Sequence, residues 1–276
     1  PTEDEQVQIY KEQLQAFAPR KVTMRTLDIG GDKALPYFPI EEENPFLGWR
    51  GIRISLDHPE IFLVQIRAML RASENNSNLK IMLPMISSIG ELDGALQLVN
   101  RAYEELINEE HLCIEKPPIG AMIEVPAAVY QVDQLAKRVD FLSVGTNDLT
   151  QYLLAVDRNN PRVAGLYNSF HPSVLSALHL IHEQASNAEC EVSICGELAG
   201  DPLGAVLLVG LGYRHLSMSA GCLSRVKSML LQVPARKARD LAERSIQITG
   251  ANEVMQFLAG ELKNPDLIKL YHRSIE

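Results

Sequence analysis

The sequence has 276 residues, of which 46% are hydrophobic and 22% are charged, and its formal net charge is −9. This composition is typical of a soluble globular protein with room for one large core or two small ones. The negative charge argues against a nucleic-acid-binding protein, and no apolar run is long enough to span a membrane. The acidic, polar N-terminus gives no indication of a signal peptide.

The cysteines indicate a reducing compartment. None of the four belongs to a CxxC pair or has a histidine at zinc-site spacing. We therefore expect reduced thiols and a cytoplasmic protein. The cysteines are Cys113, Cys190, Cys195 and Cys222.

The first quarter of the chain predicts a helix, a strand, a long loop and a second helix. Residues 5–17 form the first helix, and residues 21–29 read as a strand that is closed by two glycines. Residues 34–49 show no hydrophobic periodicity and are predicted to form a long loop. Loops of this length tend to be functional. The second helix begins at Pro59, and its predicted inward face consists of Phe62, Ile66, Met69 and Leu70.

The next stretch predicts two strands separated by a helix. Residues 80–86 form the second strand, and Ser88 to Glu91 reads as a capping box that opens a helix to about Asn108. Residues 119–125 form a third strand, which stops at Pro126.

The rest of the chain continues the alternation. The predicted elements are a helix near 127–137, strands at 139–144, 191–195 and 214–218, and helices over 172–188, 202–210 and 222–262. Strands that alternate with helices predict parallel βα units. Glycine, proline and polar residues follow the strands, as at the C-terminal face of a (β/α)8 barrel. We count six strands, whereas a closed barrel needs eight. A doubly wound open sheet is the alternative, although no GxGxxG motif follows the first strand.

Polar residues at the strand ends are candidates for chemistry. Asn147 and Asp148 follow the fourth strand, Glu124 ends the third and Cys195 ends the fifth. Glu124 and Asp148 could hold Mg²⁺, and Cys195 could act as an acid or a nucleophile. Each residue also has a plainer interpretation. Asn147 or Asp148 could cap a helix, Glu124 could be a hydrogen-bonded loop residue, and Cys195 could be a small core residue.

Three arginines could bind an anion. Arg25 lies on the first strand, Arg50 ends the long loop, and Arg158 lies ten residues after Asp148. A guanidinium binds phosphate and carboxylate through two parallel hydrogen bonds. Each arginine taken alone would more often be a salt-bridge or surface arginine than an anion ligand.

Five stretches together resemble the Enzyme I family, the phosphoenolpyruvate–protein phosphotransferases of bacterial phosphotransferase systems. They are RTLDIGGDK (25–33), ENPFLGWRGIR (43–53), GAMIEVP (120–126), SVGTNDLTQY (143–152) and CGELAGD (195–201). Three further stretches are more similar to the nitrogen-related paralogue, and they are WRGIRI (49–54), VDRNN (156–160) and LGYRHLS (211–217).

This resemblance implies a fold and a set of residue roles. The fold is a (β/α)8 TIM-type barrel of the phosphoenolpyruvate-utilising family. We expect one domain over residues 1–276 that lacks the first two strands, as the C-terminal fragment of a longer protein. Glu124 and Asp148 would ligate Mg²⁺, and Cys195 would protonate the enolate carbon. The residues implied to bind phosphoenolpyruvate are Arg25, Arg50, Asn147, Asp148 and Arg158.

The resemblance also implies partners. The family transfers the phosphoryl group to a histidine on a separate N-terminal domain and releases pyruvate, after which a small histidine-containing carrier protein accepts the phosphate. None of the seven histidines here has the phosphoacceptor context. The family's Arg-Thr-Glu motif is absent as well, so we expect the fragment alone to be incomplete for turnover. We also expect a homodimer. The alternatives are the matching domain of pyruvate phosphate dikinase or phosphoenolpyruvate synthase, and a non-catalytic sensing or dimerisation module.

Overall fold

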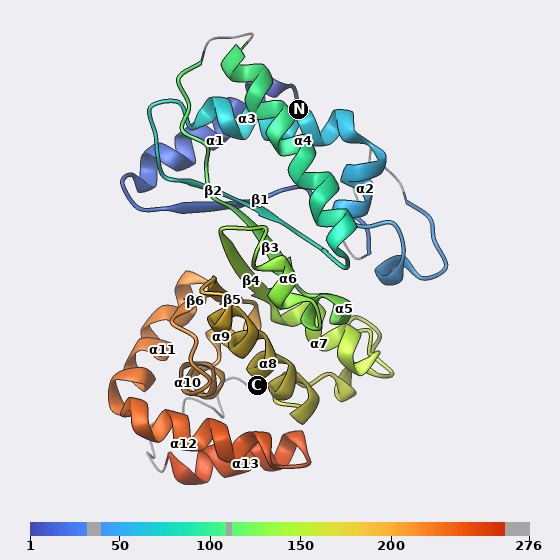
Figure 1. The fold of residues 1–276 in the computed structure, drawn as a ribbon. Coiled ribbons are helices and arrows are strands. Elements are labelled where there is room, and N and C mark those ends of the chain that lie inside the picture. Colours follow the sequence, from blue (N-terminus) through green and yellow to red (C-terminus); the bar gives the residue numbers. More distant parts are fainter. Residues whose placement is uncertain (32–39, 109–111, 263–276) are drawn as a thin grey trace. The chain divides into compact units, whose positions relative to one another are not determined.

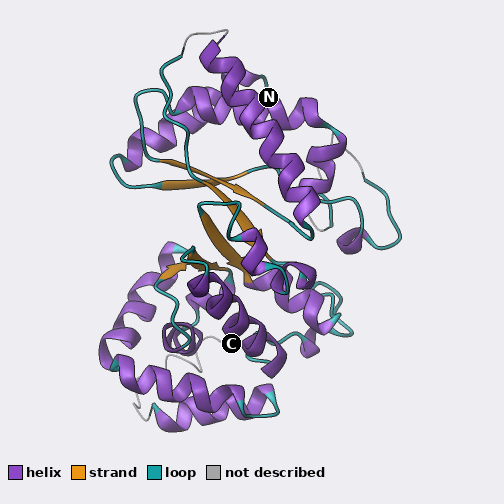
Figure 2. Cartoon of the chain, viewed as in Figure 1, coloured by secondary structure: helices purple, strands orange, loops and turns teal. Residues whose placement is uncertain are grey.

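The computed structural model describes residues 1–31, 40–108 and 112–262 (Figures 1 and 2). In these ranges six strands form one sheet, in which the strands follow one another in chain order. They are β1 (Val22–Arg25), β2 (Leu79–Leu83), β3 (Ile119–Ile123), β4 (Phe141–Gly145), β5 (Glu191–Cys195) and β6 (His215–Ser217). The pairs β1–β2, β2–β3 and β5–β6 are parallel. The predicted α/β class is confirmed, and the order is that of a barrel sheet, because a doubly wound sheet reverses its order.

The strands at the middle of the sheet order are the most deeply buried. Every residue of β3 and of β4 is buried, as expected for parallel strands whose two faces are both covered. Burial alternates along β2, whereas both end residues of β6 are exposed. The apolar runs in the sequence therefore identified the buried strands correctly.

The chain divides into two compact units. Unit 1 comprises residues 1–123 and 134–142, and unit 2 comprises residues 124–133 and 143–276. The helices of unit 1 are α1 (Glu3–Phe17), η1 (Pro45–Leu47), α2 (Ile52–Asp57), α3 (Pro59–Ala72) and α4 (Ile89–Asn108). Those of unit 2 are α5 (Pro126–Val129), α7 (Thr146–Leu154), η2 (Ala164–Leu166), α8 (Pro172–Asn187), α9 (Glu197–Gly200), α10 (Pro202–Gly210), α11 (Ala220–Gln232), α12 (Ala235–Ile246) and α13 (Ala251–Glu261). The short helix α6 (Val132–Leu135) lies at the boundary.

Unit 1 is built around α3, which packs against both α1 and α4 (Figure 1). The four predicted inward residues of α3 are all buried. At the start of α4, the Glu91 amide donates to the Ser88 hydroxyl at 3.2 Å, and the Ser88 amide donates to the Glu91 carboxylate at 3.1 Å. The predicted capping box is therefore confirmed.

Unit 2 is built around α10, a helix with apolar residues on every side. Seven of its nine residues are buried, and it packs against α9, α11 and α12. A helix that is surrounded in this way has no polar face to present.

Several elements differ from the prediction. The region 222–262 forms three helices, since α12 begins after Pro234 and α13 after Gly250. The helix expected near 127–137 is two short helices, α5 and α6. The sequence did not predict α2 or α9, which are too short to display a helical period. Of the predicted loop over 34–49, residues 34–39 lie outside the described ranges.

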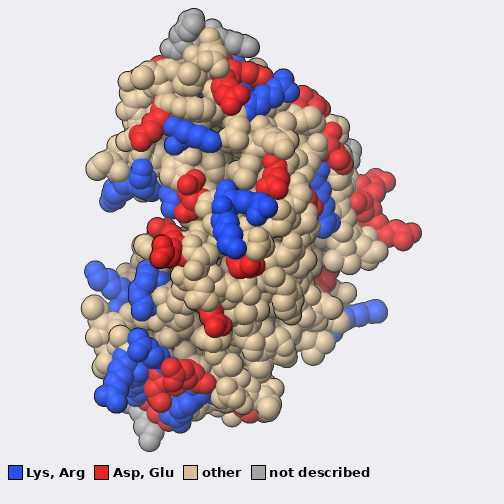
Figure 3. Space-filling model, viewed as in Figure 1, with Lys and Arg blue, Asp and Glu red and all other residues tan. Residues whose placement is uncertain are grey.

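The surface carries both signs of charge. On the face drawn in Figure 3, acidic and basic side chains are interspersed. None of the helices in the described ranges has the length and apolar character that crossing a bilayer requires.

Candidate active site

In unit 1 the structure brings two of the predicted arginines to one carboxylate. Arg50 is fully buried, and its Nε lies 3.3 Å from Oδ1 of Asp28. Nη1 of Arg25, the last residue of β1, lies 3.3 Å from Oδ2 of the same aspartate. Asp28 thus fixes the two guanidinium groups side by side. The sequence analysis did not single out Asp28, although its position three residues after Arg25 was a usable signal.

Two glycines bring Arg50 to this position. Gly30 has a φ of +98°, and a Cβ at this residue would lie 2.6 Å from the carbonyl oxygen of Trp49. Gly51 donates its amide to the carbonyl of Ile29 at 3.0 Å. The two segments therefore approach more closely than side chains would permit, which places Arg50 beside the end of β1.

In unit 2 the two predicted metal ligands are buried carboxylates. Glu124 follows β3 directly and is 1% exposed, and Asp148 is the third residue of α7 and is 6% exposed. Within the described ranges, no group of three or more His, Cys, Asp and Glu side chains could hold a metal ion. A cation bound by these two carboxylates would need further oxygen ligands from a substrate or from water.

Asn147 connects the ends of β4 and β5. Its Oδ1 accepts a hydrogen bond from the amide of Glu197 at 3.0 Å, so the NH₂ group of the side chain is left to act as a donor. The N-cap residue of α7 is Gly145, and no side chain caps the helix. The helix-capping alternative for Asn147 and Asp148 is therefore wrong.

Cys195 ends β5 and lines a pocket of about 580 Å³. Asn147 lines the same pocket, so the structure brings together two of the predicted residues. Arg225 and Cys222, on α11, also line it. The sequence analysis did not single out Arg225, because it lies within a long helical pattern and far along the chain from every motif.

Gly196 permits this arrangement. Its φ is +112°, and a Cβ there would meet the Thr146 hydroxyl and would lie 2.9 Å from Oδ1 of Asn147. The absence of a side chain at Gly196 lets the thiol and the amide share one pocket.

Arg158 lies four residues beyond α7 and is half-buried. Its amide donates to Oε1 of Gln151 at 3.1 Å. Burial raises the pKa of the Tyr167 phenol, and the positive charge of Arg158 opposes that rise. The phenol donates to the carbonyl of Asn147 at 3.2 Å. Tyr167 therefore contacts the backbone of Asn147 and lies near the charge of Arg158, and no motif in the sequence pointed to it.

The acidic residue Asp201 lies in the same pocket. Burial raises the pKa of its carboxyl, although the amides of Gly204 and Leu203 and the charge of Arg225 oppose the rise. Its Oδ1 accepts the Gly204 amide at 2.8 Å, which caps α10.

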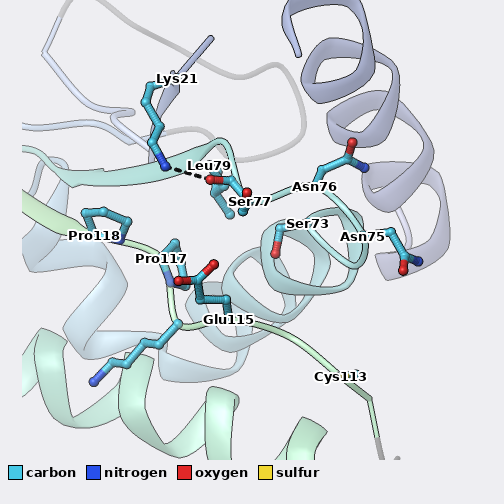
Figure 4. A pocket seen from close by; sticks show the side chains of 11 residues that line it. Lys21, Ser73, Asn75, Asn76, Ser77, Leu79, Cys113, Glu115, Pro117 and Pro118 are labelled. Atoms are coloured by element: carbon cyan, nitrogen blue, oxygen red, sulfur yellow. Dashed lines mark hydrogen bonds between the residues drawn. The ribbon is translucent and has the colours of Figure 1, made fainter. Parts of the chain in front are cut away.

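A separate pocket of about 430 Å³ lies in unit 1, where the chain enters β1, β2 and β3 (Figure 4). Lys21 lines it and donates to the carbonyl of Ser77 at 2.6 Å. None of the predicted site residues lines this pocket. The predicted residues Arg25, Glu124 and Cys195 each lie instead at the C-terminal end of a strand or directly after it.

Solved structures share the fold at low sequence identity. The malate synthase of Haloferax volcanii, in its magnesium and glyoxylate complex, superposes with a TM-score of 0.52 and 16% identity. The match covers 84% of this chain and 61% of that one. A ternary complex of the same enzyme with pyruvate and acetyl-CoA gives a TM-score of 0.50.

Relatives of known name are far more similar in sequence. The "Phosphoenolpyruvate-dependent phosphotransferase system" proteins of Salmonella typhimurium and Escherichia coli are 53% and 54% identical over 94% of this chain. The "Phosphoenolpyruvate-protein phosphotransferase" of Haloferax volcanii is 45% identical over 94% of the chain. The chain spans 35% of the length of the first two relatives and 46% of the third.

A family model settles the assignment. The model described as "PEP-utilising enzyme, PEP-binding domain" matches residues 1–235. This match agrees with the resemblance carried by the five sequence stretches. The chain therefore belongs to the family of phosphoenolpyruvate-utilising enzymes, as their phosphoenolpyruvate-binding domain.

Proposed function

We propose that this chain is the phosphoenolpyruvate-binding catalytic part of a phosphoenolpyruvate–protein phosphotransferase. It would transfer the phosphoryl group of phosphoenolpyruvate to a histidine on a separate domain and release pyruvate. The observation that carries the proposal is the pocket in which Cys195 and Asn147 meet, at the strand ends where the predicted residues lie.

The arginines would bind the anionic substrate. Asp28 holds Arg25 and Arg50 in fixed orientations, which reduces the conformational entropy that the two side chains lose when they bind an anion. Planar guanidinium groups match phosphate and carboxylate oxygens bidentately, and they neutralise charge on a transferring phosphoryl group. Arg158 and the NH₂ group of Asn147 would supply the corresponding donors in unit 2.

The buried carboxylates of Glu124 and Asp148 fit a magnesium ion. Mg²⁺ is held in proteins by one or two carboxylates together with substrate oxygens and water, and these two residues offer such a donor set. When bound, Mg²⁺ would supply positive charge against the phosphoryl and enolate oxygens. Glu124 and Asp148 would hold it and would otherwise remain unchanged through the reaction.

Cys195 would complete pyruvate formation. Loss of the phosphoryl group leaves the enolate of pyruvate, which becomes the ketone when its terminal carbon takes up a proton. A thiol is a suitable acid at such a carbon because it exchanges its proton near neutral pH. Cys195 lines the pocket with its sulfur held by β4, so its position is defined.

Several finer assignments belong to the same proposal. The nitrogen-related branch is part of the proposal because the stretches WRGIRI (49–54), VDRNN (156–160) and LGYRHLS (211–217) resemble that paralogue. The histidine that accepts the phosphoryl group would lie on an N-terminal domain of the whole protein. A small histidine-containing carrier protein would then accept the phosphoryl group from that histidine. We also propose a cytoplasmic homodimer and one domain over residues 1–276.

Thermal unfolding of this chain tests ligand binding. A ligand that binds only the folded state raises the free energy of unfolding, by about 2.7 kcal/mol at a hundred times its Kd. We expect phosphoenolpyruvate, or its enolate mimic oxalate, to raise the midpoint only when Mg²⁺ is present. Glu124→Gln and Asp148→Asn should abolish the rise, whereas Glu243→Gln, at an exposed position on α12, should keep it.

Turnover separates the proposal from its alternatives. A longer chain that carries the acceptor histidine should form pyruvate and phosphohistidine from phosphoenolpyruvate and Mg²⁺. Mg²⁺-dependent binding without pyruvate would favour a non-catalytic sensing module. Pyruvate formation that requires ATP or inorganic phosphate would favour pyruvate phosphate dikinase or phosphoenolpyruvate synthase. Neither binding nor turnover in the longer chain would refute the assignment.

A further inference from the structure

Two serines of unit 2 lead to the thiol of Cys195. The Ser193 hydroxyl on β5 donates to the Ser143 hydroxyl on β4 at 3.0 Å. Ser143 in turn donates to Sγ of Cys195 at 3.6 Å, and the thiol donates to the carbonyl of Val144 at 3.3 Å. The donors therefore run in one direction, from Ser193 through Ser143 to the sulfur.

The serines differ in burial. Ser143 is 4% exposed, whereas Ser193 and Cys195 are half-buried. A hydrogen bond in an environment that excludes water is stronger than the same bond in solvent, and a second donor polarises the first. Ser143 is thus the close donor to the sulfur, and Ser193 strengthens and orients it.

We propose that Ser143, supported by Ser193, is a positioning residue that stabilises the thiolate of Cys195. The Val144 carbonyl holds the thiol proton in the resting state, and the Ser143 hydroxyl points at the sulfur whether or not that proton is present. A donor to sulfur favours the charged form of the group. The pair would therefore make the thiol a stronger acid.

For catalysis the inference rests on the proposed function. The S–H bond of Cys195 breaks, and its proton forms a C–H bond with the electron pair of the enolate carbon, which yields the methyl group of pyruvate. The electron pair of the broken bond stays on sulfur as the thiolate. Ser143 then donates to a full negative charge, and hydrogen bonds to charged groups are about twice as strong as neutral ones.

Cys222 provides a matched comparison in the same pocket. Its Sγ lies 3.3 Å from the Ser219 hydroxyl, so a second serine contacts a second thiol. Ser219 is exposed, and the sulfur that it contacts is that of Cys222. The substitution Ser219→Ala removes a pocket hydroxyl without removing the donor to Cys195.

The test is the rate at which iodoacetamide alkylates Cys195, measured as a function of pH. Mass spectrometry of the peptide that contains Cys195 distinguishes this thiol from the other three. The measurement needs no substrate, so it remains informative if the proposed function fails. We expect Ser143→Ala to raise the midpoint of the profile by about one pH unit, from the usual strength of hydrogen bonds to charged groups. Ser193→Ala should raise it by less, and Ser219→Ala should leave it unchanged.

Unchanged midpoints in folded Ser143→Ala and Ser193→Ala would overturn the inference, because a purely structural hydroxyl alters stability and not thiol acidity. Circular dichroism across the pH range establishes folding. If Ser143→Ala does not fold, the half-buried Ser193→Ala decides the question. In the longer chain with its acceptor histidine, Ser143→Ala should lower kcat about tenfold and leave KM for phosphoenolpyruvate within twofold. If the longer chain without any substitution showed no turnover, the proposed function would be refuted, whereas the alkylation result for the thiol would still stand.

Discussion

The fully buried guanidinium of Arg50 depends on the carboxylate of Asp28, which it contacts at 3.3 Å. Removing one partner from a buried pair leaves an uncompensated charge, so Asp28→Asn should lower the free energy of unfolding by roughly 3 kcal/mol. Urea titration measures this loss. The matched control is Asp240→Asn, which removes the charge from an exposed pair with Arg244 and should change stability far less, because solvent screens that pair. Equal losses at both sites would contradict the argument.

The carboxyl of Asp201 predicts a dependence of stability on pH. Burial raises its pKa above the unfolded value, so its contribution to stability is full below the unfolded pKa and is lost as pH rises through the folded pKa. Asp201→Asn keeps the acceptor that caps α10 and removes this titration. We therefore expect the variant to be more stable than the unmodified chain at pH 7, with the advantage fading below pH 4.

Denaturant midpoints measured from pH 3 to pH 8 check this difference. Asp201→Ala separates the two roles of the side chain, because it loses the cap and should be destabilised by about 1 kcal/mol relative to Asp201→Asn at every pH. A constant difference between Asp201→Asn and the unmodified chain would refute the burial argument.

At the scale of single residues, the sequence predicted positions better than partners. Cys195 and Asn147 were found because polar residues that follow apolar runs lie at the ends of parallel strands. Asp28 and Tyr167 were missed, because the first contacts Arg50 across 22 residues and the second reaches Asn147 from a loop 20 residues away. The spacing of Arg25 and Asp28 was a local signal, whereas the contacts with Arg50 and Asn147 are formed by packing and leave no pattern in one sequence.

Among the elements, the turn between α10 and β6 depends on Gly212. Its φ is +111°, and a Cβ there would meet the ring of His182. Gly212→Ala should therefore lower the free energy of unfolding by about 2 to 4 kcal/mol, through left-handed strain and overpacking. Gly221→Ala on α11 is the control, because nothing lies within 4 Å of a Cβ at that position. It should be neutral or stabilising by less than about 1 kcal/mol. Thermal and urea unfolding measure both changes.

The helices and strands were predicted well where the hydrophobic pattern is clear and turn residues mark its ends. The range predicted for β5 matches the structure, and α8 ends within a residue of its prediction. The helices α2 and α9 were missed because they have six and four residues, which is too few for a helical repeat. The single stretch 222–262 was divided by Pro234, whose ring cannot continue a helix, and by Gly250.

The whole molecule has two compact units, and its single tryptophan, Trp49, lies in unit 1. Trp49 donates to Asp57 at 2.7 Å, so its fluorescence should report the unfolding of unit 1. We expect Leu241→Ala, in the core of unit 2, to destabilise by about 2 to 5 kcal/mol in circular dichroism while the Trp49 midpoint stays fixed. Ile66→Ala in α3 should shift the Trp49 midpoint instead. Equal shifts of both signals in both variants would identify one cooperative unit.

At the scale of the whole molecule, the sequence predicted the α/β fold class but not the division into two compact units. Six apolar runs that alternate with helical stretches sufficed to predict a parallel α/β sheet, because this alternation is a property of the chain itself. The chain crosses between the units next to the end of β3, within α6 and within β4, and none of these places is a linker rich in glycine, proline and charged residues. Composition therefore could not reveal it.

The orientation of the Asn147 side chain determines which of its polar groups a ligand in the pocket can meet. Since the amide of Glu197 occupies one lone pair of its oxygen, the NH₂ group of the side chain is the part that remains oriented as a donor to a ligand. A ligand group that faces this NH₂ needs lone pairs, so at this point of the pocket a carboxylate, phosphate or enolate oxygen is favoured over an amine. Asn147→Asp, nearly identical in shape, would keep the bond to Glu197 and invert this preference. A single backbone amide thus sets which end of the Asn147 side chain meets a ligand.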